Sequence, residues 1–268
     1  TNVSLDMNKE IKIQRMGNTT DRQDEVGTTP IEYESISMFN PQDGFASFLI
    51  PAVLILIIQQ TLLLGIGLSA GTAREKNRYQ DLVPLNRKYN GTLRIVLGKS
   101  LAYLMVYAAI SAYVLCAIPK MFSLVQLPDT FTLAMFILPY LLACIFFAMT
   151  CSIFIHHRES CMMIYVFTSV PLLFISGISW PGAAIPDFWK IVSWIAPSTF
   201  GINGFVRINS MGATLSDVST EFHALWLQAG IYFITTCIVY RKQIQISHKH
   251  REEKLKIVRK YFRLVKKE

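Results

Sequence analysis

The residues of this sequence that come closest to a catalytic motif are Gly98, Lys99 and Ser100. Gly-Lys-Ser closes the phosphate-binding loop of nucleotide-hydrolysing proteins, where backbone N–H groups curl around the phosphates before the Lys and the hydroxyl reach the γ-phosphate and Mg²⁺. That loop needs four residues between its two glycines. Here six residues separate Gly91 from Gly98, and Leu93 stands where the first glycine should be. The spacing predicts that this chain does not bind ATP, and that any ATP it depends on is bound by another subunit.

Histidine and cysteine also fall into no pattern that predicts metal binding or catalysis. His156 and His157 are neighbours, so on a helix they point to different faces, and Glu159 is the carboxylate nearby. The five cysteines lie within or at the ends of apolar blocks, without a C-x-x-C pair; they are Cys116, Cys144, Cys151, Cys161 and Cys237. We therefore predict no catalytic residue, no metal site and no cofactor bound by this chain.

The elements that hold these residues are apolar blocks long enough to cross a membrane. Of the 268 residues, 52% are hydrophobic, and residues 45–70 carry no charge. A helix of that length, at about 1.5 Å per residue, crosses the roughly 30 Å hydrocarbon core of a bilayer. The same test picks out residues about 95–118, 131–155, 160–179 and 222–240. The predicted fold is an all-α membrane protein with about five transmembrane helices, its transmembrane domain covering residues 45–240.

The distribution of Lys and Arg predicts which side of the membrane each connection occupies. Residues 74–99 carry seven Lys or Arg and residues 241–268 carry eleven, whereas residues 119–130 carry one. Because basic residues accumulate on the inner side, the loop at 74–99 and the tail are predicted to be cytoplasmic. Residues 1–44, with eight acidic and four basic residues, are then the end of an extracytoplasmic domain with short strands and turns. The localisation follows as the cell (inner) membrane, and the net charge of +8 requires no nucleic acid partner.

The stretch from residue 176 to 206 is apolar but interrupted. Its breaks are Gly177, Pro181, Gly182, Pro186, Pro197, Gly201 and Gly204. A lipid-exposed spanning helix would leave the freed backbone groups without partners, and Trp180, Trp189 and Trp194 favour a headgroup interface. We predict a helix that ends near Gly177, a broken re-entrant element at residues 180–206 on the outer side, and a return to the surface near Arg207. A plain hydrophobic outer loop is the alternative.

The basic tail carries an amphipathic pattern. Leu255, Val258, Phe262 and Val265 fall on one helical face and are surrounded by Lys and Arg. Such a helix can lie on the inner leaflet or contact a partner, and a solvated helix is equally consistent with the pattern.

The spans carry no Asp, Glu, Lys or Arg at mid-membrane depth. Ion-coupled transporters and proton pumps need such groups as relays or binding sites, so the pattern argues against them. Polar residues within the spans are uncharged, and most such groups hold helices together. The candidates for a substrate path are Gln59, Gln60 and Thr168.

Two motifs at a characteristic separation carry a family resemblance. The first span exits into GTAREKNRYQDLVPLNRK, and SGISWPGAAIPDFWKIVSWIAPSTFGINGFVRI precedes the last span. Nearly the whole chain resembles the permease subunits of ABC-2 type ATP-binding-cassette exporters. Those permeases have an Arg-Glu-Lys-rich segment after the second helix and a late series of Ser-Gly, aromatic-Pro, Pro, Trp and Pro-x-Thr. The matching residues are Arg74, Glu75, Lys76, Ser176, Gly177, Trp180, Pro181, Pro186, Trp194, Pro197 and Thr199.

The resemblance implies a larger subunit and several partners. A first helix and a large extracytoplasmic domain would precede Thr1, so the sequence would be the C-terminal part of the permease. Two permeases, either two copies or a copy and a paralogue, would be served by cytoplasmic ATPase subunits that hold ATP and Mg²⁺. The expected function is ATP-driven export of an amphipathic, lipid-like or drug-like substrate taken from the cytoplasm or the inner leaflet of membrane lipid. A non-transport scaffold or sensor subunit and an intramembrane lipid-modifying enzyme are the alternatives.

The resemblance also gives roles to the two motifs. Closure of the ATPase pair would push on residues 74–92, where Arg74, Glu75, Lys76 and Arg78 can form charge-assisted bonds. The broken outer element would act as an extracellular gate, because discontinuous segments change conformation at lower cost than continuous helices. The expected gate residues are Gly177, Trp180, Pro181, Pro186, Trp194 and Pro197.

Overall fold

The computed structural model describes residues 45–76, 91–122, 129–155, 157–177 and 185–265, and every regular element in these ranges is a helix. The predicted all-α fold class is therefore confirmed. The elements are α3 (Phe45–Glu75), α4 (Thr92–Ala112), the π-helical turn η2 (Tyr113–Ala117), α5 (Ile118–Met121), α6 (Thr130–Cys151), the 3₁₀ turn η3 (Ser152–Phe154), α7 (Arg158–Ile175), α8 (Asp187–Ser193), α9 (Pro197–Met211) and α10 (Ser219–Val265). The segment at 1–44 lies outside the described residues.

Within the described ranges, five helical segments are long and apolar enough to cross a membrane, which is the number that the sequence predicts. They are Leu49–Glu75, Thr92–Met121, Thr130–Phe154, Arg158–Ile175 and Ser219–Ile246. The chain is thus a multi-pass membrane protein. The first spanning helix extends five residues past the predicted end at residue 70, because Gly71, Thr72 and Ala73 continue it to Arg74 and Glu75.

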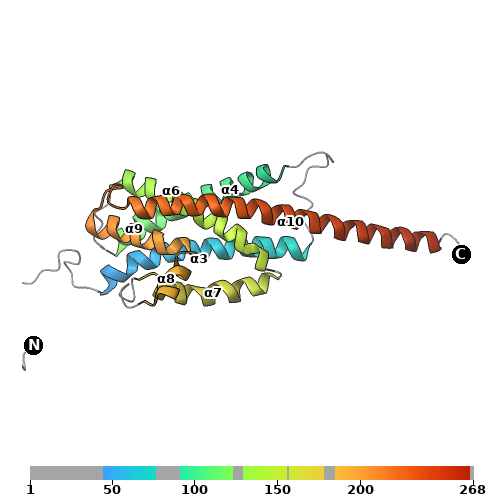
Figure 1. Ribbon diagram of the computed structural model, residues 1–268, viewed down its shortest axis with the longest axis horizontal. Coiled ribbons are helices and arrows are strands. Elements are labelled where there is room, and N and C mark those ends of the chain that lie inside the picture. Colours follow the sequence, from blue (N-terminus) through green and yellow to red (C-terminus); the bar gives the residue numbers. More distant parts are fainter. Residues whose placement is uncertain (1–44, 77–90, 123–128, 156, 178–184, 266–268) are drawn as a thin grey trace, which may run out of the picture. The chain divides into compact units, whose positions relative to one another are not determined.

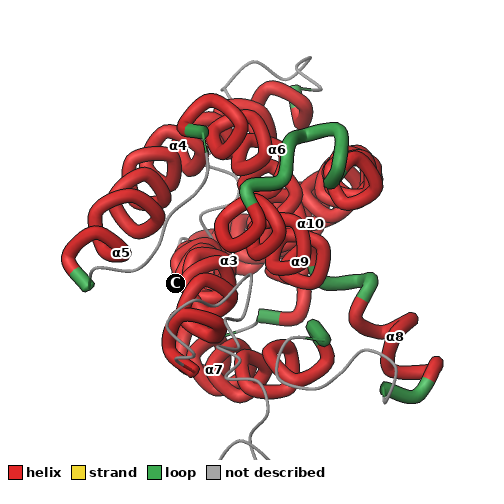
Figure 2. The backbone as a smooth tube through the Cα atoms, turned by 90° about the vertical axis from the view of Figure 1, so that its left-hand side faces the viewer, coloured by secondary structure: helices red, strands yellow, loops and turns green. Residues whose placement is uncertain are grey.

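Four helices form the centre of the bundle and two lie on its flanks. α3 packs against α6, α7 and α9, while α10 packs along α6 and also touches α4 and α9 (Figure 1). In the view of Figure 2, α4 and α7 lie on opposite sides of this centre. In the most apolar stretch of each spanning segment, 11% of the residues of α4 and of α7 are buried, compared with 56% for α3 and 61% for α6. α4 and α7 therefore turn most of their apolar surface toward lipid or a partner.

The Gly-Lys-Ser sequence lies inside α4, well past the first turn of that helix. The Ser100 hydroxyl donates to the carbonyl of Leu97 at 3.0 Å, and the Lys99 Nζ lies 5.4 Å from the centre of the Tyr240 ring. These contacts place Lys99 against α10 as a cation above an aromatic face. Further along, the helix widens into η2 just before Pro119, whose missing N–H cannot pair with the carbonyl four residues earlier.

α9 lies so close to α6 that two positions of α9 have room for glycine and not for a larger residue. A Cβ atom built on Gly201 would overlap the ring of Tyr140, and one on Gly204 would overlap the ring of Phe136. Both rings are 0% exposed, and the Tyr140 hydroxyl donates to the carbonyl of Ile55 on α3 at 2.7 Å. The two glycines therefore seat α9 against α6, while Tyr140 ties the same place to α3.

The predicted broken element at 180–206 contains two helices, α8 and α9, and its residues 178–184 lie outside the described part. Gly201 and Gly204 do not interrupt α9, because the helix is packed in protein and their small size is used for close approach. α9 also continues past Arg207, near which the sequence predicts a return to the surface. It ends at Met211, where Gly212 has a φ of 63° and closes the helix with a left-handed cap.

α10 crosses the predicted boundary between the last span and the tail at residue 240 without a break. At about 1.5 Å per residue, its 47 residues make a helix of roughly 70 Å, more than twice the thickness of the hydrocarbon core. A continuous helix leaves the membrane along the direction of its span. The structure therefore does not favour a tail that lies flat on the inner leaflet.

Threonines join α10 to α6. The Thr150 hydroxyl lies 2.9 Å from that of Thr235 and 3.0 Å from that of Thr236, and the Thr236 hydroxyl lies 3.0 Å from the carbonyl of Phe146. Small hydroxyl residues of this kind let transmembrane helices approach and bond to each other.

Before α10 begins, the Thr214 hydroxyl and backbone N–H both donate to the Asp217 carboxylate, and these bonds hold the pKa of that carboxyl below its usual range.

An ion pair connects α9 to the start of α10, and its removal should destabilise the fold. Arg207 Nη1 lies 2.9 Å from Glu221 Oε1, and the Glu221 side chain is 11% exposed. Arg207→Met leaves this carboxylate buried without its cation, so we expect the free energy of unfolding to fall by about 1–3 kcal/mol. The estimate is reduced because Arg207 is 50% exposed. Chemical unfolding in detergent micelles measures the change.

The exposed pair between Lys190 and Asp187, at 3.1 Å, supplies the control. Lys190→Met should change the free energy of unfolding by less than about 1 kcal/mol, because the Asp187 side chain is 93% exposed and stays hydrated. If the free energy of unfolding fell equally in the two variants, the ion pair between Arg207 and Glu221 would stabilise the fold no more than an exposed pair does.

Candidate functional site

Arg74 and Glu75, two of the predicted coupling residues, are bonded within the chain. Arg74 Nη1 donates to the carbonyl of Ile153 at 3.0 Å and to that of Ile155 at 2.6 Å. Glu75 Oε1 accepts the backbone N–H of Arg158 at 3.0 Å, at the start of α7. We call these five residues the Arg74 clasp. It satisfies the carbonyls of Ile153 in η3 and of Ile155 just after it, together with an N–H at the beginning of α7, and so fixes the connection between α6 and α7 to the end of α3.

Two further contacts tighten the clasp. A Cβ atom on Gly71 would lie 3.0 Å from the Arg158 backbone, so α3 and the start of α7 are nearly in backbone contact. His157 Nδ1 lies 3.8 Å from Glu75 Oε1. Of the other predicted coupling residues, Lys76 is exposed and Arg78 lies outside the described residues. The structure thus separates Arg74 and Glu75, whose side chains bond to other parts of the chain, from Lys76, which is exposed without such a described bond.

Two of the three predicted substrate-path residues line one cavity. This cavity, which we call the α3–α7 cavity, has a volume of about 480 Å³. Gln60 and Leu63 line it from α3, Phe147 and Cys151 from α6, and Tyr165 and Thr168 from α7. Gln59 points elsewhere: its amide donates to the Ser198 hydroxyl of α9 at 3.2 Å and lies 3.5 Å from Cys144 Sγ of α6. Gln59 is therefore part of the helix packing, and Gln60 belongs to the cavity.

Tyr165 is a cavity residue that the sequence analysis missed. It is 6% exposed, and its ring lies against α3 where a Cβ atom on Gly67 would come within 2.6 Å of it. The signal was present in the spacing, since Tyr165, Thr168 and Leu172 lie three and four residues apart and so share one face of α7. A tyrosine within an apolar span is more ambiguous than a glutamine, because its ring suits the core and its hydroxyl alone is polar.

Residues of the predicted gate element also line the α3–α7 cavity, and we call these residues the cavity cover. Val192 of α8 and the connecting Ile195 and Ala196 are among its lining residues. This cover is fixed to α10, because Gln228 Nε2 donates to the Trp194 carbonyl at 2.6 Å and the Tyr232 hydroxyl donates to that of Ile195 at 2.5 Å. The cover is therefore held by side chains of a spanning helix.

The other predicted gate residues have different positions. Pro186 precedes the first residue of α8, Trp194 follows α8 and is 60% exposed, and Pro197 is the buried first residue of α9. Gly177 follows α7 with a φ of 86°, a conformation that strains any residue with a Cβ atom. Trp180 and Pro181 lie outside the described residues. The structure thus brings Trp194 and Pro197 to the cavity cover, and leaves Pro186 and Gly177 at helix ends.

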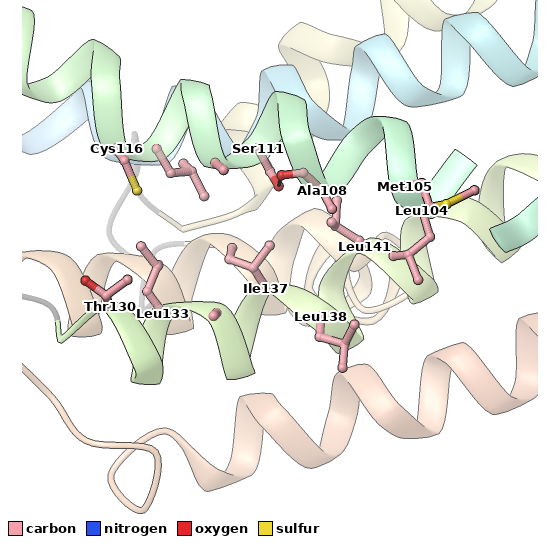
Figure 3. A pocket seen from close by; sticks show the side chains of 13 residues that line it. Leu104, Met105, Ala108, Ser111, Cys116, Thr130, Leu133, Ile137, Leu138 and Leu141 are labelled. Atoms are coloured by element: carbon pink, nitrogen blue, oxygen red, sulfur yellow. Dashed lines mark hydrogen bonds between the residues drawn. The ribbon is translucent and has the colours of Figure 1, made fainter. Parts of the chain in front are cut away.

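A second cavity of about 420 Å³ separates α4 from α6 (Figure 3). Leu104 and Ser111 of α4 and Leu133 and Ile137 of α6 are among the residues that line it. The Ser111 hydroxyl is already bonded to the carbonyl of Ala108 at 3.1 Å. This α4–α6 cavity is therefore mainly apolar. Of the two hydroxyl residues that line it, Ser111 is bonded and Thr130 is exposed at the start of α6.

The described residues contain no group of three or more His, Cys, Asp or Glu side chains that could hold a metal ion. Of the two neighbouring histidines, from which the sequence predicts no metal site, His157 precedes α7 beside Glu75, and His156 lies outside the described part.

Comparison with known proteins gives one match. A family model described as "ABC-2 family transporter protein" matches residues 2–238. No curated protein and no solved structure matches the chain. The matched range includes both motifs of the sequence, the α3–α7 cavity and the Arg74 clasp.

Proposed function

This chain belongs to the ABC-2 family of transporter proteins, and from that membership we propose that it is the membrane-spanning permease subunit of an ATP-driven exporter. In this proposal a separate cytoplasmic ATPase subunit binds and hydrolyses ATP with Mg²⁺. The permease moves an amphipathic, lipid-like or drug-like molecule out of the cytoplasm or the inner leaflet. It acts together with a second copy or a paralogue in the cell membrane.

The observation that carries the proposal is the position of Ile155. Its carbonyl accepts a bond from Arg74 at 2.6 Å, and its side chain lines the α3–α7 cavity. The same cavity is lined by Val192, Ile195 and Ala196. A movement at the end of α3 would therefore reach the cavity wall through Ile155. The cavity cover belongs to the same wall.

A transport cycle follows from these contacts. The ATPase pair would push on the cytoplasmic segment after α3, where the exposed Lys76 would form charge-assisted contacts and the sequence adds a second cation, Arg78. The Arg74 clasp would pass the movement to the start of α7, which is tied to α3 by Glu75. α7 would then shift against the cavity, and release of the cover at Ile195 would open the outer side.

The positive-inside distribution supports the proposed orientation, with residues 74–99 and the basic tail in the cytoplasm and residues 1–44 outside. Partners on the inner side would meet Lys76, Arg78 and the extension of α10 beyond Ile246. The flanking helices α4 and α7, which are 11% buried, offer apolar surface to lipid and to the second permease.

We expect the protein to co-purify with its ATPase subunit and to raise the rate of nucleotide hydrolysis. The two would be co-expressed and reconstituted in lipid nanodiscs, where bound ATPase and hydrolysis are recorded. Lys76→Glu with Arg78→Glu should lower the recovered ATPase at least about tenfold, because each reversal replaces an attraction by a repulsion. Lys120→Glu changes the same charge on α5 and should leave recovery unchanged.

Each other outcome has a defined meaning. Association without cargo-dependent hydrolysis would favour the scaffold or sensor subunit, and conversion of a lipid without any ATPase would favour the intramembrane enzyme. Absence of association with any ATP-binding-cassette ATPase would contradict the exporter proposal.

A further inference from the structure

Two polar side chains at the α3–α7 cavity have buried atoms without partners. Both the nitrogen and the oxygen of the Gln60 amide are buried and have no hydrogen-bond partner among the described residues, and the same is true of the Tyr165 hydroxyl. Gln59, the neighbour of Gln60, is by contrast bonded to Ser198. The missing partners are therefore not a property of every glutamine on α3. Gln243 of α10 is another described residue whose two amide atoms are buried without a partner, but it does not line this cavity.

Polar atoms in this position are costly. A buried donor or acceptor left unpaired costs about 1–3 kcal/mol, and within a bilayer no bulk water is at hand to relieve it. Gln60 carries two donors and an acceptor, and Tyr165 carries one group that can do both. A ligand that offers a complementary group in the cavity would remove these costs when it binds.

The remaining wall limits what that group can be. The rest of the cavity is mainly aliphatic and aromatic, with Leu63, Phe147 and Leu172 among its lining residues, and none of the described residues that line it is Asp, Glu, Lys or Arg. A charged group would lose its hydration there without an opposite charge to replace it. An uncharged group that both donates and accepts, such as an alcohol or an amide, fits the pairing capacity of Gln60 and Tyr165. The volume of about 480 Å³ is in the range of pockets that hold small molecules.

We propose that the α3–α7 cavity binds an uncharged amphiphile, whose neutral polar group pairs with the Gln60 amide and the Tyr165 hydroxyl and whose apolar part lies along Phe147 and Leu172. That this ligand is also the transported cargo rests on the proposed function. Binding itself requires no ATPase. Thr168, whose hydroxyl already donates to the Ile164 carbonyl at 2.5 Å, can add an acceptor.

The α4–α6 cavity serves as an internal comparison. It is of similar size and also apolar, but its Ser111 hydroxyl is bonded. It should accept alkyl chains without regard to the headgroup. Selectivity for an uncharged headgroup should therefore appear at the α3–α7 cavity and not at the α4–α6 cavity.

Photolabelling in nanodiscs tests the proposal on the full-length protein. The probes are a monoacylglycerol with a diazirine in its chain and the same chain ending in a phosphate, and labelled residues are mapped by mass spectrometry. We expect the monoacylglycerol to label Phe147 or Leu172 at least about tenfold more than the phosphate probe does. Labelling near Leu133 of the α4–α6 cavity should differ by less than about twofold between the probes.

Two variants remove the polar atoms while keeping the shape. Gln60→Leu and Tyr165→Phe should each lower monoacylglycerol labelling of the α3–α7 cavity by about five- to tenfold, and Ser111→Ala should leave it unchanged. Because Gln60→Leu removes an unpaired buried amide, the thermal unfolding temperature without probe should stay the same or rise. A merely structural Gln60 would instead give a lower unfolding temperature.

Equal labelling by the two probes, or unchanged labelling in both variants, would overturn the proposal. So would a lower unfolding temperature for Gln60→Leu. These results would leave the exporter proposal intact, since the association with an ATPase is measured separately. Conversely, selective labelling of a protein that binds no ATPase would keep the ligand class and remove the exporter function.

Discussion

Arg74→Met should lower the free energy of unfolding by about 2–4 kcal/mol and reduce the number of molecules exported per ATP at least about tenfold. The change removes two charge-assisted bonds, at 3.0 Å to Ile153 and 2.6 Å to Ile155, and leaves these two carbonyls in and just after η3 without their donor. Transport suffers beyond the loss of stability, because Ile155 lines the α3–α7 cavity and loses its bond to the end of α3. The bond from Glu75 still holds the start of α7. Chemical unfolding and paired assays of export and hydrolysis measure the two effects.

Lys76→Met is the matched control for stability, because it removes a cation two positions along that is exposed and has no described side-chain bond. It should leave the free energy of unfolding unchanged within about 0.5 kcal/mol. Arg74→Lys keeps the charge but replaces a planar fork by a single ammonium, so an intermediate loss is expected. If Arg74→Met exported cargo with the normal ratio to ATP, the clasp would be a structural contact and not a lever.

The sequence was sufficient for the number of spanning helices because the bilayer imposes simple limits. A span must be about 20 residues of mainly apolar side chains, and charges gather in the connections. Residues 45–70 meet these limits without reference to any other part of the chain. The family could be predicted for a similar reason, because its two motifs are local in sequence.

The partners of Arg74 could not be predicted from the sequence. They are backbone carbonyls of Ile153 and Ile155, 79 and 81 positions away. Every residue has such a carbonyl, so no sequence pattern marks the ones that accept a bond. An Arg after a span is therefore assigned to a cytoplasmic partner by default. The same limit applies to Gln59 and Gln60, which are identical in type but point into a helix contact and into a cavity.

The glycines of α9 show a second limit. In a lipid-exposed helix Gly201 and Gly204 would be unfavourable, and their density in the stretch predicts a break. Whether a helix faces lipid or protein depends on the other helices, and here α9 is enclosed by α3, α6 and α10. The same two residues that predict an interruption are then the reason that a continuous helix fits.

Gly201→Ala should be one of the most damaging small changes in the chain, with a loss of about 2–4 kcal/mol in the free energy of unfolding. The added methyl group overlaps the Tyr140 ring, which is 0% exposed and cannot move into open space. Its displacement also stretches the 2.7 Å bond from the Tyr140 hydroxyl to the Ile55 carbonyl. Chemical unfolding in micelles measures the loss, and probe labelling reports the α3–α7 cavity, because Ala196 immediately precedes α9.

Gly230→Ala is the control that separates crowding from helix propensity. Gly230 lies within α10 with no other side chain within 4 Å of a built Cβ atom, so Ala should stabilise the helix by up to about 1 kcal/mol. Two Gly→Ala changes in helices are thus expected to have opposite signs. A similar gain in both would show that α9 and α6 can separate without cost.

A double variant then identifies the clash. Tyr140→Val removes the ring that Gly201→Ala would overlap, so the two losses should sum to at least about 1 kcal/mol more than the loss in the combined variant. Simple additivity would mean that the methyl group acts elsewhere in the bundle. Coupling would mean that the position of α9 on α6 is fixed by a contact between a glycine and an aromatic ring.

The cavity cover, which includes Ile195 and Ala196, would then be held on two sides. One side is the contact of α9 with α6, and the other is the pair of bonds from Gln228 and Tyr232 of α10. Opening of the cover would therefore require α9 and α10 to move with respect to each other.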